Sequence, residues 1–194
     1  MKKLLILVCL ICATAFAKAQ TLADVKASPK LTWYGIDFSE TRFLNFGGFL
    51  RQESMETNLN FWSYDPFGND DADHWKKKFK KDELGVNIKS SHDRNHKTDF
   101  AQHMGTEPFE MKEEDLKKIL SEYEISGNGY GLLFVPEKYD NVGTKKAYIW
   151  GVFINEADKT IINAEKFVVE CYGDWNEAIK FGVRQCSRHL AKAK

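Results

Sequence analysis

The sequence lacks an excess of charge of either sign, and it lacks a long apolar run beyond its first residues. Its 28 basic residues balance 28 acidic residues over 194 positions. A balanced chain exerts no long-range attraction on nucleic acid or on acidic membranes, so we expect no nucleic-acid partner. After residue 19, no stretch approaches the roughly 18 apolar residues that a transmembrane helix needs, which predicts no transmembrane segment. Internal repeats and low-complexity tracts are also missing.

Cysteine is scarce as well, and only Cys171 and Cys186 lie beyond residue 19. In an exported protein such a pair suggests a disulfide. Geometry argues against it, because Cys171 ends a predicted strand and Cys186 lies well inside the following predicted helix. The separation is roughly 16 Å along that helix, whereas bridged Cα atoms lie within about 7 Å. We favour two free, largely buried thiols and keep the disulfide as the alternative.

The first 19 residues have the pattern of a secretory signal peptide. Two lysines precede a short apolar segment at residues 4–13, and a small-x-small site (Ala-Lys-Ala) occupies residues 17–19. The apolar segment is too short to span a membrane. We therefore expect cleavage after Ala19 and export to the periplasm or the outside of the cell. Residues 20–194 are expected to form a single α+β domain.

Apolar periodicity predicts alternating strands and helices over most of the remaining chain. The predicted strands cover residues 31–38, 130–135, 147–154 and 160–170. The predicted helices cover residues 40–60, 73–84, 111–125 and 175–192. Residues 20–30 are expected to form a polar lead-in, and residues 85–108 a long polar loop that holds three histidines. Long loops in compact domains are usually functional or mobile.

The order of these segments predicts the arrangement of the sheet. Helical crossovers between the first strand and residues 130–135 would make these two strands parallel. The last three strands would form an antiparallel meander, with a hairpin turn at residues 156–159. We predict an α+β fold with a mostly antiparallel mixed sheet of four to five strands. Helices pack on this sheet, and an amphipathic helix closes the chain.

Three strands carry a resemblance to a known group of proteins. Residues 33–39, 131–137 and 148–154, followed by the closing helix, resemble a family of uncharacterised secreted bacterial proteins. More loosely, they are similar to the sheet of TolB amino-terminal-type and outer-membrane-lipoprotein α/β domains. The resemblance covers about half of the chain and rests on the residue pattern of the strands. It implies a role in the cell envelope and brings no catalytic residue.

Residues 62–75 place several carboxylates between two tryptophans. An EF-hand calcium loop is excluded, because reading frames from Asp65 and Asn69 both put lysine at the twelfth position, where a glutamate is needed. The acids instead suit the start of the basic helix at residues 73–84, where carboxylates cap backbone N–H groups and oppose the helix dipole. The lysines that follow are expected to form a solvated face rather than a nucleic-acid patch.

Four aromatic residues flank this acidic turn: Trp62, Tyr64, Phe67 and Trp75. Aromatic faces beside carboxylates can hold sugars or the side chains of a partner protein. They can equally anchor the loop to the core, since large apolar groups seldom stay exposed. We take these four as candidate ligand-binding residues, toward a protein or glycan partner in the cell envelope.

A second set of candidates, for metal binding, consists of His92, His96, His103 and Asp99. In a helix, His92 and His96 would share one face, as the zinc ligands of HExxH enzymes do. No glutamate follows His92, however, and Arg94 between the two histidines would repel a cation. A metal ion is therefore the alternative, and no other cofactor is expected.

Catalytic motifs are missing. There is no GxSxG elbow, and the glycines at residues 127–131 follow a helix and open a strand, the reverse of a dinucleotide-binding turn. Cys186 and His189 could touch on one helix, but Cys186 lies on its apolar face and buried thiols are usually inert. Asp37, after the first strand, could join a pair of carboxylates.

The prediction is an exported, non-enzymatic envelope domain with a binding or assembly role. A metal-dependent hydrolase or metal-binding protein is the alternative, and a carbohydrate-binding module the second.

Overall fold

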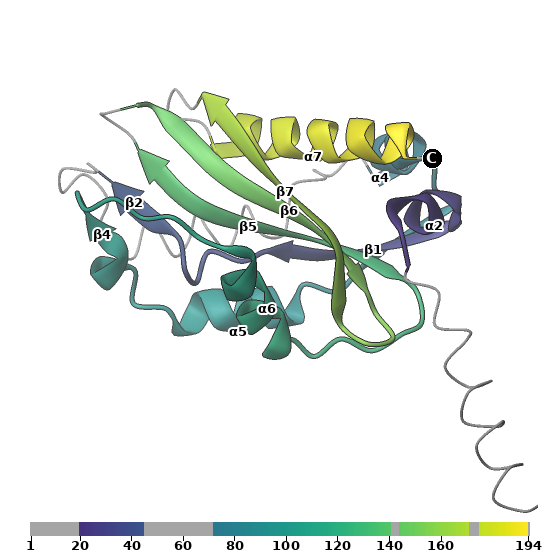
Figure 1. Ribbon diagram of the computed structural model, residues 1–194, viewed down its shortest axis with the longest axis horizontal. Coiled ribbons are helices and arrows are strands. Elements are labelled where there is room, and N and C mark those ends of the chain that lie inside the picture. The colour runs from purple at the N-terminus through teal and green to yellow at the C-terminus, as the bar shows by residue number, and fades with distance from the viewer. Residues whose placement is uncertain (1–19, 45–71, 141–143, 171–174, 194) are drawn as a thin grey trace, which may run out of the picture.

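Strands and helices alternate along most of the described chain (Figure 1). The computed structural model describes residues 20–44, 72–140, 144–170 and 175–193. The strands are β1 (Lys30–Ile36), β2 (Arg42–Leu44), β3 (Glu83–Val86), β4 (Met104–Gly105), β5 (Tyr130–Asp140), β6 (Lys146–Asn155) and β7 (Thr160–Glu170). The helices are α2 (Leu22–Ala27), α4 (Ala72–Phe79), α5 (Lys89–Lys97), the 3-10 helix η1 (Phe100–His103), α6 (Glu113–Ser121) and α7 (Trp175–Lys192).

These strands form one seven-stranded sheet. On one side of β5, β1 and β2 lie one after the other along its length, and β3 and β4 lie outside them. β1 pairs with the first half of β5 and β2 pairs with its last residues, both in parallel. β3 and β4 lie beside β1 and β2 in the same way. The chain therefore runs along β5 twice in one direction, as β1 and then as β2. Between them, at residues 37–41, the sheet is interrupted.

The prediction of an α+β fold with a mostly antiparallel sheet of four to five strands is wrong. The sheet has seven strands, and four of its six strand pairings are parallel, with antiparallel pairing confined to β5–β6 and β6–β7. Each helical crossover returns the chain to the same end of the sheet, which makes the next strand parallel. The fold is therefore of the α/β class. The parallel pairing of β1 with β5, and the meander of the last three strands, were predicted correctly.

Helices cover both faces of the sheet. α2, α4 and α7 lie on one face, and α5 and α6 lie on the other (Figure 1). The first face buries Phe79 of α4 and Leu190 of α7 against strand residues such as Phe134. On the second face, Leu120 of α6 packs near Val152. Because side chains alternate along a strand, β5 and β6 supply residues to both cores.

The closing helix α7 has the bounds that the sequence predicts. Its residues Cys186 and Leu190 are buried against the sheet, while Arg184 and Arg188 are exposed, as an amphipathic helix requires. Among the described residues, no helix is both long enough and apolar enough to cross a membrane.

Four predicted segments differ from the structure. The helix predicted at residues 73–84 is α4, which ends at Phe79, and β3 begins at Glu83. The lead-in at residues 20–30 contains helix α2, which begins with a capping box between Thr21 and Asp24. Residues 40–60 were predicted to be helical, but their described part contains strand β2, and the remainder lies outside the described residues. The predicted loop at residues 85–108 holds α5, η1 and β4. Helix α5 escaped prediction because its buried residues are polar, so it has no apolar periodicity.

Gly35 lets helix α5 approach strand β1. Its φ is +87°, and a Cβ atom at this position would lie 2.4 Å from Ser91 Oγ. The pairing of β1 with β5 also shifts register between Trp33 and Ile36. Only glycine adopts such a backbone without strain and leaves room for the helix.

Replacing Gly35 with alanine is expected to lower the free energy of unfolding by about 1–3 kcal/mol from backbone strain, with the contact to Ser91 adding to the loss. The matched control is Gly85→Ala, where the nearest atom to the new Cβ would be Thr32 Oγ1 at 3.5 Å. Urea denaturation of both variants measures the difference. Equal stabilities of the two variants would contradict this account of Gly35.

Candidate functional site

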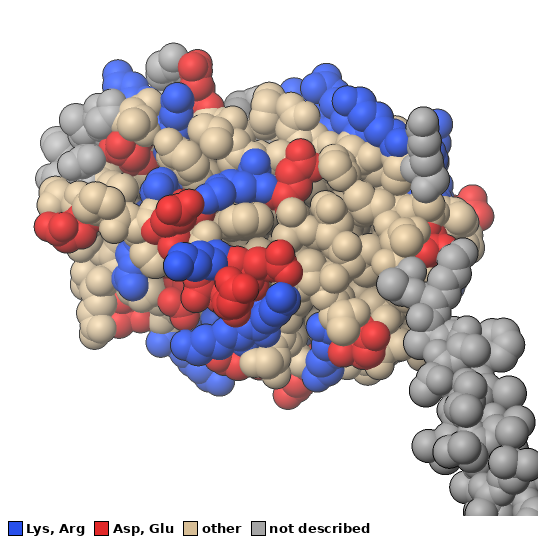
Figure 2. Space-filling view, viewed as in Figure 1, with Lys and Arg blue, Asp and Glu red and all other residues tan. Residues whose placement is uncertain are grey.

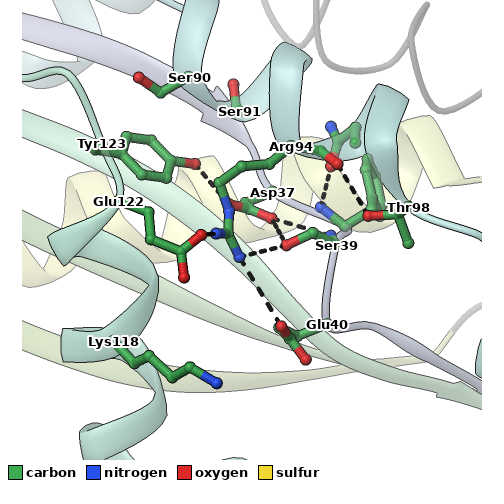
Figure 3. Close-up of polar contacts among 12 residues, drawn as sticks. Asp37, Ser39, Glu40, Ser90, Ser91, Arg94, Thr98, Lys118, Glu122 and Tyr123 are labelled. Carbon is green, nitrogen blue, oxygen red and sulfur yellow. Dashed lines mark hydrogen bonds and ion pairs between the residues drawn. The ribbon is translucent and has the colours of Figure 1, made fainter.

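Polar side chains from α5 and from the residues just after α6 fill the break in the sheet between β1 and β2 (Figure 3). Asp37 follows the end of β1 at the carboxyl edge of parallel strands, where α/β proteins commonly place functional groups. The backbone keeps some contact with β5 here: Asp37 N–H donates to the Phe134 carbonyl at 2.8 Å, and Thr41 Oγ donates to the Pro136 carbonyl at 2.7 Å. The remaining groups at the break need partners from elsewhere.

Asn95 and Ser91 of α5 supply those partners. The Asn95 side chain accepts a hydrogen bond from Phe38 N–H at 2.7 Å and donates to the Ile36 carbonyl at 2.8 Å. Its amide thus replaces a neighbouring strand at the point where pairing stops. Ser91 Oγ donates to the Tyr34 carbonyl, 2.8 Å away. Both side chains are buried, so these bonds offset the desolvation of the polar groups.

The charges at the centre of the break belong to Asp37 and Arg94. Asp37 is fully buried, and its Oδ2 accepts hydrogen bonds from Arg94 Nε and from the Tyr123 hydroxyl, each at 2.8 Å. Its Oδ1 accepts from the Ser39 backbone and from Ser39 Oγ. Arg94 also donates to Ser39 Oγ at 2.7 Å and to Glu122. The pair therefore joins β1, α5 and the end of α6.

The electrostatics favour a neutral Tyr123 and a charged Arg94. Burial, together with the Asp37 carboxylate, raises the pKa of Tyr123 well above its usual value, so the phenol stays neutral and donates. Burial opposes the charge of Arg94, but Asp37 and Glu122 outweigh it and raise the pKa of Arg94. Both oxygens of Asp37 already accept hydrogen bonds within the cluster. The arrangement suits a structural cross-link better than acid–base chemistry.

A small cavity of about 90 Å³ adjoins Arg94. Its lining residues come from the loop after β1, from α5 and from the α6 region: Glu40, Arg94, Phe109, Met111, Asp115, Lys118, Ile119 and Glu122. Ligand pockets usually enclose about 300–1,000 Å³, and each water occupies about 30 Å³. This cavity has room for a few waters rather than for an organic ligand.

A different surface lies on the same face of the sheet, along β5, β6 and β7. Three cations each lie over an aromatic ring: Lys138 Nζ at 4.6 Å from the Tyr148 centroid, Lys166 Nζ at 5.1 Å from Trp150, and Arg42 Cζ at 5.2 Å from Phe109. We call these six residues the cation–aromatic row. None of them was singled out from the sequence as a site residue. Cross-strand register brings Lys138, Tyr148, Trp150 and Lys166 together, and Phe109 reaches Arg42 from the loop before α6.

Glu137 contacts both lysines of the cation–aromatic row and Trp150. It is the extra residue of a β-bulge between Pro136 and Lys138, and its side chain is fully buried. Its Oε2 accepts hydrogen bonds from Lys166 Nζ at 2.9 Å and from Trp150 Nε1 at 3.2 Å. Lys138 Nζ lies 3.3 Å from Oε1, an ion pair without good hydrogen-bond geometry. The bulge turns a carboxylate toward both lysines and holds them over the rings.

The four aromatic residues predicted from the acidic turn are not brought together by the described residues. Trp62, Tyr64 and Phe67 lie outside the described residues. Trp75 belongs to helix α4, whose backbone alone is described at that position. Their part in ligand binding stays a prediction.

Of the four predicted metal ligands, the structure brings His92 and His96 together. Their rings stack on one side of α5, with centroids 6.1 Å apart.

The other two predicted ligands have different partners. Asp99 caps η1 by accepting a hydrogen bond from Ala101 N–H. His103 Nδ1 lies 3.1 Å from the Thr41 carbonyl, and burial, followed by Arg42, lowers the pKa of His103. Within the described ranges, no group of three or more His, Cys, Asp or Glu residues could hold a metal ion. A metal site here stays a prediction.

Cys186 is a free, buried thiol, as predicted, and Cys171 lies outside the described residues. Near it, Glu165 Oε2 lies 2.8 Å from His189 Nδ1, so the cluster has the residue types of a catalytic triad. Burial, and then Glu165, raises the pKa of the Cys186 thiol well above its usual value. A protonated thiol is a poor nucleophile, so this cluster is better explained by packing.

Comparisons with known proteins add little to this picture. No family model matches the chain, and no curated protein matches it. One similar solved structure is the LpoB C-terminal domain from Salmonella enterica, with 12% identity, a TM-score of 0.27, and coverage of 82% of this chain and 92% of that one. Another is protein XCC0632 from Xanthomonas campestris, with 9% identity, a TM-score of 0.31, and coverage of 87% and 85%. Both TM-scores are too low to carry an argument about function.

Replacing Asp37 with asparagine is expected to lower the free energy of unfolding by about 3–5 kcal/mol, because Arg94 loses its one fully buried charge partner among the described residues and keeps only the more exposed Glu122 and Glu40. The matched control is Glu83→Gln, which removes the ion pair with Lys30, in which the side chains are 57% and 65% exposed. Exposed pairs contribute about 0–1 kcal/mol. Thermal and urea denaturation compare the two variants. A loss at Asp37 as small as the loss at Glu83 would contradict a structural role for the buried pair.

Proposed function

We propose that this chain is an exported, non-enzymatic domain that binds an extended segment of a partner protein along strand β7. The observation that carries the proposal is the edge of the sheet. β7 is eleven residues long, and within the described part of the chain it pairs with β6 alone. Along residues 160–169, the backbone groups on its other side can therefore accept an added strand, a common mode of peptide recognition.

The side chains of β7 favour such a partner. In the described residues only two large apolar side chains are exposed, Val86 at 63% on β3 and Val168 at 49% on β7. Ile161, Ile162 and Ala164 of β7 are half-buried. Figure 2 shows an area without charged side chains over the strands of the described β6–β7 hairpin, with charged side chains beside it and at the turn. A partner strand would cover this apolar edge.

The cation–aromatic row continues from β7 across the sheet. Val168 pairs in register with Tyr148, and Lys166 pairs with Trp150. Tryptophan, tyrosine and arginine are the residue types that most often dominate binding energy at protein interfaces. Every second side chain of an added strand would reach this row. The hydrogen bonds to the β7 backbone would then give affinity, and the contacts with the row would give specificity. Edge backbone groups favour a protein partner over a glycan.

Replacing Val168 with lysine is expected to weaken binding of the partner by about tenfold or more, which corresponds to about 1.4 kcal/mol. A photo-crosslinking amino acid at position 168 identifies the partner in cells, and calorimetry with the purified partner measures the affinity. Val86→Lys is the matched control, because Val86 is also exposed on an edge strand. Equal effects of the two substitutions, or no effect at Val168, would rule out β7 as the binding edge.

The export part of the proposal rests on the pattern of residues 1–19. Expression of the full chain in a Gram-negative host is expected to yield an exported protein that begins at Gln20, as determined by N-terminal sequencing. Leu7→Arg interrupts the apolar segment and is expected to leave an uncleaved chain in the cytoplasm. An exported wild-type chain that keeps residues 1–19 would contradict the cleavage site.

A further inference from the structure

A groove of about 510 Å³ opens where three helices end. Figure 1 shows α2, α4 and the C-terminal end of α7 gathered at one end of the molecule. The residues that line the groove come from these helices and their last turns: Ala23, Lys26, Ala27, Lys78, Phe79, Lys80, Leu190, Ala191 and Ala193. The volume falls within the range of ligand pockets, about 300–1,000 Å³.

The groove has an apolar floor and walls. Phe79 and Leu190 form the floor, where they are 3% and 2% exposed and belong to the core on this face. Alanines from α2 and from the end of α7 form the walls. Since alanine side chains are short, the three helices leave a space between them instead of closing on it. An apolar, slender ligand could displace water from this space.

Two lysines neutralise the helix ends around the groove. Helix C-termini carry partial negative charge on carbonyls that lack intrahelical partners. Lys26 Nζ donates to the Ala191 and Ala193 carbonyls of the α7 end, at 2.9 and 2.7 Å. The buried Lys81 donates to the Ser28 carbonyl at 2.7 Å and to Val25 at the end of α2. At the ends of α2 and α7, these carbonyls, which would repel an anion, are therefore already engaged.

The charged residues that line the groove are all lysines. Lys26, Lys78 and Lys80 are exposed, and no acidic residue belongs to the lining among the described residues. The sequence alone predicts a solvated face for this lysine run, because the run does not reveal that α2 and α7 lie beside it. A ligand that fits must combine an apolar body with an anionic head.

We infer that the groove binds a long-chain fatty acid, with its acyl chain between α2, α4 and α7 and its carboxylate beside Lys78 and Lys80. The carboxylate would form charge-assisted hydrogen bonds with ammonium groups at the rim. The chain would contact Phe79 and Leu190 at the floor. This site is separate from β7 and does not depend on partner binding there.

The test is calorimetry of residues 20–194 with palmitate below its critical micelle concentration. One palmitate per chain is expected, and uncharged glycerol monopalmitate is expected to bind about tenfold more weakly or worse. Equal binding of the uncharged compound, or no palmitate binding, overturns the inference. Tighter binding of lysophosphatidylglycerol than of palmitate overturns the assignment to a free fatty acid and favours a lipid headgroup.

Variants test the placement of the ligand. Ala191→Trp fills the groove, and Lys78→Glu reverses a charge at its rim, so each is expected to weaken palmitate binding about tenfold or more. Lys77→Glu is the matched control, because Lys77 lies on the same helix and outside the lining. Val168→Lys is expected to leave palmitate binding unchanged. If Lys77→Glu weakens binding as much as Lys78→Glu, or if neither groove variant weakens it, the groove is not the site.

Discussion

The buried pair of Arg94 and Asp37 is the interaction on which the rest of the structure depends. A parallel sheet with a break along its middle exposes backbone groups to the interior, and such groups are costly without partners. Helix α5 closes this break with Arg94, Asn95 and Ser91, and Tyr123 completes the cluster. Because α5 can approach only where β1 has no side chain, Gly35 and the polar cluster form one structural unit.

This unit separates two parts of the molecule with different properties. On the α5 and α6 face, charged and aromatic residues continue from the cluster toward β7, the long edge of the sheet. On the opposite face, α2, α4 and α7 meet around an apolar groove with lysines at its rim. The polar network thus maintains the shape of the sheet, and the edge and the groove are the surfaces for which we propose binding.

Sequence reasoning succeeded where an element is long and has one apolar side. The helix α7 and the meander of β5, β6 and β7 were predicted in their correct places, since periodicity is reliable over ten or more residues. It failed for β2, β3 and β4, which have two to four residues each. It failed for α5 as well, whose buried residues Ser90, Ser91 and Asn95 are polar. Asp37 was noticed from its position, but Arg94 and Tyr123 were not recognised as its partners.

By itself, the sequence determined the long strands, the closing helix, the pattern of a signal peptide and the near balance of charge, because each is a property of neighbouring residues. Tertiary structure alone decided which distant residues meet. Arg94 reaches Asp37 across 57 positions, and Lys26 reaches the end of α7 across 165. Pairing over such separations follows from strand order and register, which short strands and polar helices do not encode in a local pattern.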